Sequence, residues 1–387
     1  MRLTARRDLT MTFSPDGRIC YRSVGAGIEG TGPAEAALVL AFCSEPRSRA
    51  ELVQRFGAMG GAAFDSMKSG GLLVPIDLAD DTELFFDSFT SLDMHRRMLC
   101  DQPRVDGYAA AIKAAIEPGM VVLDAGTGTG LLACIAAAAG AKHVYAVDRS
   151  SLSLAKAVVN ASGFSDRISL IQGDLKDIKL PEDVDLVITE TFGALALSEG
   201  GMPDVTACCE KNLSPNGIVL PSAFSLMFAP IVDLAELAES PDIFKLTHGA
   251  NLSPLRAEAF RRGVVVDIPL SALGGAPQTL VTAPYPGPPH ASGSVRFPHI
   301  DGIRLVGWAG WFDLHLTDDH ILSTGPSAPQ THWRQSLLAI EPWVVDPGSP
   351  IDLSVSITPA KGDRRGLEIA TQWQQGPNSG SAFHRMV

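Results

Sequence analysis

Apolar and polar positions follow two different patterns along the chain. In the middle part, apolar runs of strand length, such as Val121–Leu123, His143–Val147 and Val184–Ile188, are separated by segments with helical spacing. One of these segments, Leu131–Gly140, ends on a glycine, as many helices do. The alternation between 119 and 225 predicts a parallel sheet with helices on both faces. Ligands of such sheets bind at the carboxyl ends of the strands.

The pattern changes at about residue 226, where short β-prone runs separated by loops rich in proline and glycine begin. These runs predict an antiparallel sandwich or barrel. They are Gly263–Ile268, Gly302–Leu314, Ser336–Ile340, Ile351–Ile357 and Leu367–Gln372. The segment Asp233–Phe260, which precedes them, is predicted to be helical or loop-like.

The first 80 residues follow a third pattern, in which a hairpin precedes short helices and a final strand. This pattern predicts a small α+β domain with a winged-helix arrangement. Thr10–Phe13 and Arg18–Arg22 flank Ser-Pro-Asp-Gly, which is a hairpin signal. A predicted helix at Pro33–Phe42 follows. Ser48 and Glu51 have the spacing of a capping box, and they open a second helix that runs through Phe56. A third helix, at about Ala62–Ser69, leads into the apolar strand Leu72–Pro75.

Composition narrows the class of protein. A chain of 387 residues that is 45% hydrophobic and 19% charged is expected to form two or three globular domains. We expect no membrane span and no signal peptide, because long apolar runs are missing from the sequence. The six cysteines lack metal-ligand spacing, which favours reduced thiols in a cytoplasmic protein. The net charge of −12 disfavours nucleic acid as a partner and suits a cationic peptide or protein.

A glycine-rich turn between the first central strand and its helix predicts a cofactor site. The strand ends at Asp124, and the turn that follows contains Gly126, Thr127, Gly128 and Gly130 before the helix opens at Leu131. Glycines let a ligand approach the backbone at a helix N-terminus. Asp148 ends the next strand, where a carboxylate can accept both hydroxyls of a ribose. An adenosine-type cofactor is the favoured interpretation; a dinucleotide of a dehydrogenase and an ordinary tight turn are the alternatives.

From about residue 84 onward, four motifs together resemble the protein arginine N-methyltransferases. The turn V-L-D-A-G-T-G-T-G resembles the signature of class I S-adenosylmethionine enzymes. The stretch T-E-T-F-G-A-L-A-L-S-E, Thr189–Glu199, resembles the family's double-glutamate loop. Thr331-His332-Trp333 resembles its Thr-His-Trp loop, and F-F-D-S-F…M-H-R-R-M-L-C-D-Q-P-R resembles its N-terminal lid helix.

The resemblance implies a role for each matching residue. S-adenosylmethionine is the implied cofactor. Glu190 and Glu199 would hold the acceptor guanidinium, and His332 would pair with Asp87 of the lid segment. For the cofactor, the resemblance implies that Arg104 pairs with the methionyl carboxylate and that Asp148 binds the ribose. The adenine would contact Asp174 or the backbone of Leu175 and Lys176. His95 and Met98 would line the cofactor and substrate side. A homodimer formed through an arm at 233–260 is also implied.

The chemistry of the acceptor agrees with this resemblance. A guanidinium is planar, permanently charged and has five donors, so two carboxylates can hold and orient it for attack on a sulfonium methyl. The chain departs from the family pattern at two places. It has Phe85 and Phe89 where the family has tyrosines. Within the glutamate loop, Thr191, Phe192 and Ala194 also differ from the residues of the family. A peptide histidine or amine N-methyltransferase is therefore an alternative. A non-catalytic binding protein with a degenerate site is another.

The N-terminal domain resembles the leader-peptide-recognition domains of peptide-modifying pathways. The resemblance rests on a helix followed by S-R-A-E-L-V-Q-R-F-G and F-D-S-M-K-S-G-G-L-L-V. It implies that the substrate is a ribosomally synthesised precursor peptide. Nucleic-acid binding and a purely structural role are the alternatives for this domain. We therefore predict a recognition domain at 1–80, a Rossmann-like methyltransferase domain at 81–225 and a β-barrel substrate domain at 226–387.

Overall fold

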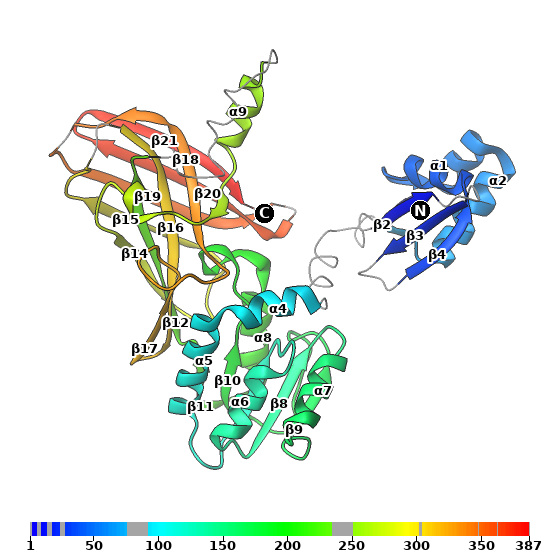
Figure 1. Cartoon of the computed structure of the whole chain (residues 1–387), viewed down its shortest axis with the longest axis horizontal. Coiled ribbons are helices and arrows are strands. Elements are labelled where there is room, and N and C mark those ends of the chain that lie inside the picture. Colours follow the sequence, from blue (N-terminus) through cyan, green and yellow to red (C-terminus); the bar gives the residue numbers. More distant parts are fainter. Residues whose placement is uncertain are drawn as a thin grey trace. The chain divides into compact units, whose positions relative to one another are not determined.

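The computed structural model describes residues 2–5, 9–13, 18–23, 28–75, 92–233, 251–301, 304–346, 348–361 and 363–386. The chain divides into two compact units, 1–94 and 95–387. Figure 1 labels the helices and strands of both units. In the described part of the chain, no helix is both long and apolar enough to span a membrane.

In its described residues, the first unit combines two small antiparallel sheets with two helices. In one sheet β1 (Arg2–Ala5) lies between β5 (Arg47–Ser48) and β6 (Leu73–Pro75). The other has β3 (Arg18–Ser23) between β2 (Leu9–Phe13) and β4 (Ile28–Pro33). The helices are α1 (Glu35–Phe42) and α2 (Arg49–Ser69). Buried apolar side chains from both sheets and both helices, among them Leu3, Ile19, Leu40, Leu52 and Phe64, give this unit a core of its own.

Local signals account for most of the first unit. The hairpin strands pair as predicted, although the turn between them, 14–17, lies outside the described residues. The capping box at α2 is confirmed, because the Ser48 side chain accepts from the Glu51 backbone and the Glu51 carboxylate accepts from Ser48 N at 2.8 Å. The two helices predicted after Ser48 form one element that is interrupted at Gly57, whose φ is 68°. No pattern in the sequence predicted β4, which contains two glycines and a proline.

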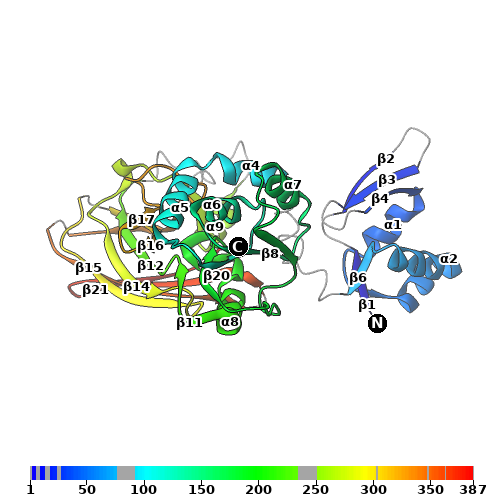
Figure 2. The ribbon, with the colours of Figure 1, turned by 90° about the horizontal axis from the view of Figure 1, so that it is seen from below.

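The second unit begins with a five-stranded parallel sheet in the order β11-β10-β7-β8-β9. The strands are β7 (Val121–Ala125), β8 (His143–Asp148), β9 (Ile168–Gln172), β10 (Val184–Thr189) and β11 (Leu213–Leu220). The helices are α4 (Leu92–Cys100), α5 (Gln102–Ala115), α6 (Leu131–Ala139), α7 (Ser153–Ala161) and α8 (Met202–Asn212). Figure 2 shows α8 on the side of the sheet opposite α6 and α7. The predicted Rossmann-like arrangement is confirmed.

Two antiparallel sheets follow, as predicted from the β-prone runs. The first has the order β13-β18-β16-β12-β14, with β17 paired to β16, and the second has the order β15-β19-β20-β21. The strands are β12 (Ala223–Ile231), β13 (Val264–Val266), β14 (Gln278–Pro284), β15 (Ala291–Phe297), β16 (Arg304–Thr317), β17 (His320–Ser323), β18 (Gln335–Val344), β19 (Ile351–Ala360), β20 (Asp363–Gln375) and β21 (Asn378–Met386). Helix α9 (Ser253–Ala259) lies between β12 and β13 in the sequence, whereas residues 234–250 of the predicted arm lie outside the described residues.

One hydrophobic core connects the parallel sheet to the β-barrel. It includes Ile188 at the end of β10, Phe192 in the loop that follows, Phe224 on β12 and Trp308 on β16. Short 3-10 turns in that loop, η1 (Ala194–Ala196) and η2 (Ser198–Gly200), stand between β10 and α8. Because apolar residues of this loop are buried in the shared core, the barrel positions the loop at the carboxyl edge of the sheet.

Candidate active site

The turn after β7 has a backbone that requires glycine. Gly126, Gly128 and Gly130 have φ values of 84°, 53° and 79°, which side chains with a Cβ rarely adopt. The turn is held by Gly126 N and Thr127 N, which both donate to Val147 O at 2.9 Å. A Cβ at position 126 would also lie 2.9 Å from Thr191 Cγ2. The turn therefore brings bare backbone close to the loop that follows β10.

Asp124 fixes the base of this turn. Its Oδ2 accepts from Thr127 Oγ1 at 2.6 Å and from Ala133 N at 3.0 Å, at the start of α6. Burial raises the pKa of Asp124 to about 7, against the opposing effect of these hydrogen bonds. Its Oδ1 is buried and has no hydrogen-bond partner within the described chain, which leaves an acceptor for a ligand.

Asp148 lies at the carboxyl end of β8, as predicted. Its Oδ2 accepts from Gly128 N at 2.9 Å and its Oδ1 from Ser150 N at 2.8 Å, so the carboxylate is oriented beside the glycine turn. The next residue, Arg149, contacts the Asp174 carboxylate at 3.5 Å, which places the predicted adenine-side acid near the same edge. Leu175 packs against the core, and Lys176 is exposed. The glycine backbone, the unpartnered Asp124 oxygen and the oriented Asp148 fit a nucleoside cofactor.

The two predicted glutamates lie on the loop that follows β10, within electrostatic range of one another. Glu190 follows β10 directly, and Glu199 lies in η2 with a φ of 73°. Burial raises the pKa of Glu190, an effect that the charge of Arg104 opposes. The pKa of Glu199 is raised to about 8, first by burial and then by the charge of Glu190. The charge of Glu190 therefore acts on the Glu199 carboxyl group within a site of low polarity.

A glycine makes room for this arrangement. A Cβ on Gly193 would lie 2.0 Å from Ser198 Oγ and 2.7 Å from Glu199 Cγ. Glu199 can therefore fold back against position 193 only because residue 193 has no side chain.

Arg104 forms an ion pair with Glu190, with 2.9 Å between Nη1 and Oε2. Both side chains are nearly buried, at 8% and 11% exposure. The guanidinium also donates from Nη2 to Met98 O at 2.7 Å, which ties α5 to the end of α4. His95 is buried on α4, with its Cε1 3.3 Å from where a Cβ on Gly128 would be. Burial lowers the pKa of His95, which favours a neutral ring next to the turn.

His332 is held by Asp101. Asp101 Oδ2 accepts hydrogen bonds from the backbone N and from Nδ1 of His332, each at 2.8 Å. Its Oδ1 accepts from Arg104 N at 3.2 Å, and this bond caps the N-terminus of α5. The predicted partner, Asp87, lies outside the described residues. Sequence reasoning missed Asp101, although an aspartate directly before Gln-Pro-Arg is an N-cap signal.

Other contacts complete the surroundings of the glutamates. Trp333 Nε1 donates to Phe192 O at 2.7 Å, so the loop containing His332 also holds the glutamate loop. The buried Tyr108 hydroxyl donates to Thr189 O at 3.0 Å. The Tyr285 ring lies 4.6 Å from the ring of Phe192 and beside Thr191. Neither tyrosine carried a signal in the sequence that distinguished it from an ordinary core residue.

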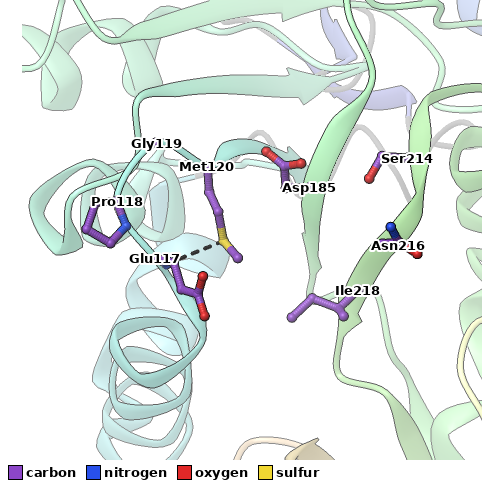
Figure 3. Close-up of a pocket in the computed structure, with 8 residues that line it drawn as sticks. All are labelled: Glu117, Pro118, Gly119, Met120, Asp185, Ser214, Asn216 and Ile218. Atoms are coloured by element: carbon purple, nitrogen blue, oxygen red, sulfur yellow. Dashed lines mark hydrogen bonds between the residues drawn. The ribbon is translucent and has the colours of Figure 1, made fainter.

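A separate hollow of about 390 Å³ is shown in Figure 3. It lies at the amino ends of β7, β10 and β11, between the segment 117–120 and the residues Asp185, Ser214, Asn216 and Ile218. Asp185 accepts there from Val121 N at 2.9 Å. Because β7 runs from this hollow toward Gly126, the hollow lies at the opposite edge of the sheet from the glutamates.

Comparisons with known proteins agree with this geometry. The family described as "Methyltransferase domain" matches residues 122–217, and the "Arginine methyltransferase oligomerization subdomain" matches 292–377. Protein arginine N-methyltransferase 1 of Schizosaccharomyces pombe is 30% identical over 308 residues, which cover 76% of this chain and 90% of the relative. Protein arginine N-methyltransferase 1.1 of Arabidopsis thaliana is 30% identical over 320 residues, with 79% and 82% covered.

The chain belongs to the protein arginine N-methyltransferase family. A solved structure, the Trypanosoma brucei PRMT1 enzyme-prozyme heterotetrameric complex with AdoHcy, matches with a TM-score of 0.71 and 27% identity, covering 78% of this chain and all of that one. The family predicted from the motifs is therefore confirmed. So is the order of a Rossmann-like domain followed by an antiparallel barrel. Membership in this methyltransferase family removes the dehydrogenase alternative.

Proposed function

We propose that this chain transfers a methyl group from S-adenosylmethionine to an arginine side chain of a peptide or protein. The observation that carries the proposal is the pair Glu190 and Glu199, two buried carboxyl groups next to a glycine turn that fits a nucleoside. The named activity of the relatives and the AdoHcy in the trypanosome complex support the same reaction and cofactor. A cationic multi-donor acceptor suits two such carboxylates.

In this reaction, different residues would bind the cofactor and the acceptor. S-adenosylmethionine supplies an electrophilic methyl group on a sulfonium. Asp148 would accept hydrogen bonds from the ribose, and Arg104 would pair with the methionyl carboxylate. Glu190 and Glu199 accept the N–H groups of the guanidinium and orient one nitrogen. The acceptor nitrogen would lose a proton as the methyl group is transferred to it, and a Glu199 carboxylate kept ionised by the bound guanidinium would receive that proton.

The test of this reaction is tandem mass spectrometry of peptides incubated with methyl-labelled S-adenosylmethionine. We expect label on arginine side chains, with the label lost in Glu190→Gln and Glu199→Gln. Label on histidine or on an amine would instead show that Thr191 and Ala194 have changed the acceptor. No transfer to any peptide, together with intact cofactor binding, would favour a binding protein.

We further propose that the first unit recruits the substrate, as a recognition domain for a precursor peptide. Its separate core and its α+β composition support an independent binding module. Removing residues 1–78 leaves α4 intact and tests this role. The KM for a long precursor peptide should rise, while the Kd for the cofactor and the turnover of a short arginine peptide should not change. An unchanged KM for the precursor would refute recruitment.

A homodimer formed through the segment 233–260 belongs to the same proposal. The match of 292–377 to an oligomerization subdomain supports assembly of this chain with itself. Light scattering on the intact chain should give the mass of a dimer, and a deletion within 234–250 should give the mass of a monomer. A monomer for the intact chain at micromolar concentration would contradict the proposal.

A further inference from the structure

A barrel residue, Arg364, contacts the backbone beside the second glutamate. Arg364 lies at the start of β20, and its Nε and Nη2 donate to Gly200 O at 3.0 and 2.8 Å. The same guanidinium forms an ion pair with Asp204 on α8. Three elements that are distant in sequence, β20, η2 and α8, therefore meet at one side chain.

The backbone held in this way is unusual. Glu199 and Gly200 have φ values of 73° and 66°, two left-handed residues in succession. A non-glycine residue in this region persists only where the surrounding structure holds it. Packing is close as well, because a Cβ on Gly200 would lie 2.5 Å from Arg364 O.

The loop is also fixed at its other end. Trp333 donates to Phe192 O just before the loop folds back at Gly193. The segment that contains Glu199 is thus held by barrel side chains on both sides, by Trp333 before it and by Arg364 after it. The Arg364 guanidinium contacts the Gly200 carbonyl and the Asp204 carboxylate, so its effect on Glu199 is transmitted through the backbone.

We propose that Arg364 is a positioning residue for the reaction: its two hydrogen bonds to the Gly200 carbonyl hold Glu199 in the left-handed conformation that directs its carboxylate toward Glu190 and the acceptor. This inference rests on the proposed function, since it assigns to Glu199 the role of holding the guanidinium. According to this proposal, the barrel helps to position a residue that binds the acceptor. The contact between the start of β20 and η2 would then serve the reaction.

The first experiment compares Arg364→Ala, Arg364→Lys and a control variant by steady-state kinetics on one arginine peptide. Arg364→Ala should lower kcat about 100-fold, the effect of a misplacement of about 1 Å at a reacting centre, while the Kd for the cofactor stays the same. Arg364→Lys keeps the charge but offers one donor nitrogen in place of the two that bond Gly200 O, and should recover part of the loss. The matched control is Arg296→Ala, which removes an exposed barrel arginine paired with Asp352 and should keep wild-type kcat. Wild-type kcat in a folded Arg364→Ala variant would overturn the proposal.

The second experiment is a double-mutant cycle between positions 364 and 199. If Arg364 acts through Glu199, then adding Arg364→Ala to Glu199→Gln should lower the transfer rate little further, because the group it positions is already gone. Equal and additive losses in both backgrounds would mean that Arg364 serves only general stability. Full turnover in Glu199→Gln itself would refute the proposed function of the glutamates, which is a different outcome from the failure of the positioning role.

Discussion

Arg104 and Glu190 form a nearly buried ion pair, with 2.9 Å between Nη1 and Oε2. The sequence predicted both residues for binding, but for two different ligands. Their contact joins the N-terminal end of α5 to the carboxyl end of β10. A substitution at either residue therefore changes the electrostatics of both parts of the site.

The two glutamates should differ in their effect on stability. Glu190→Gln leaves Arg104 buried without its counter-ion, and should lower the free energy of unfolding by about 3–5 kcal/mol. Glu199→Gln removes a buried carboxyl group next to a like charge, and should leave the free energy of unfolding at pH 8 unchanged or higher. Urea unfolding of both variants at that pH measures the difference. Equal destabilisation of the two variants would contradict it. Both should lose turnover by orders of magnitude.

The stability of the protein should depend on pH through Glu199. Its pKa is 4.5 without the fold and about 8 within it, so the folded state binds the additional proton between these values. Its carboxyl group therefore destabilises the fold progressively as pH rises from 4.5 to 8, with a slope of about 1.4 kcal/mol per pH unit. The difference in unfolding free energy between wild type and Glu199→Gln should show this slope. The exposed control Glu258→Gln should show none, and a flat difference for Glu199→Gln would rule the pKa shift out.

Asp101 combines two roles that two substitutions can separate. Asparagine caps helices as well as aspartate does, so Asp101→Asn should keep α5 capped while removing the charge opposite His332. Asp101→Ala loses both, and should cost at least about 1 kcal/mol of stability. We expect turnover to fall in both variants and the unfolding midpoint to fall mainly with alanine. Wild-type turnover in Asp101→Asn would show that the contact with His332 is structural only.

Gly193→Ala should disturb the conformation of the glutamate loop without changing the affinity for the cofactor. The added Cβ would meet Ser198 and Glu199 at distances no real contact allows, so the loop must open and Glu199 must move. Turnover should fall strongly, while calorimetry should show an unchanged Kd for S-adenosylmethionine. Gly163→Ala serves as a control, since that glycine also has a positive φ but has open space around its Cβ position. Its effect should be confined to a small loss of stability.

Several features of this protein follow from the sequence alone because they depend on near neighbours in the chain. The capping box connects Ser48 and Glu51, three positions apart, and it forms as predicted. The glycines at 126, 128 and 130 have positive φ values, as a tight turn between a strand and a helix requires. The β-prone run Ile351–Ile357 was predicted as a strand, and it forms most of β19, where buried and exposed residues alternate.

The contacts that assemble the site join residues far apart in sequence, and only the tertiary structure decides them. His332 pairs with Asp101 across 231 positions, and no local pattern selects that aspartate among the acids of its region. The resemblance placed Arg104 on the cofactor, whereas packing also brings it against Glu190. The same holds for Arg364 and Gly200, 164 positions apart. The sequence determines which strands, turns and caps form, because those depend on the spacing of nearby side chains. The meeting of barrel, helix and glutamate loop depends on how those elements pack over the shared core.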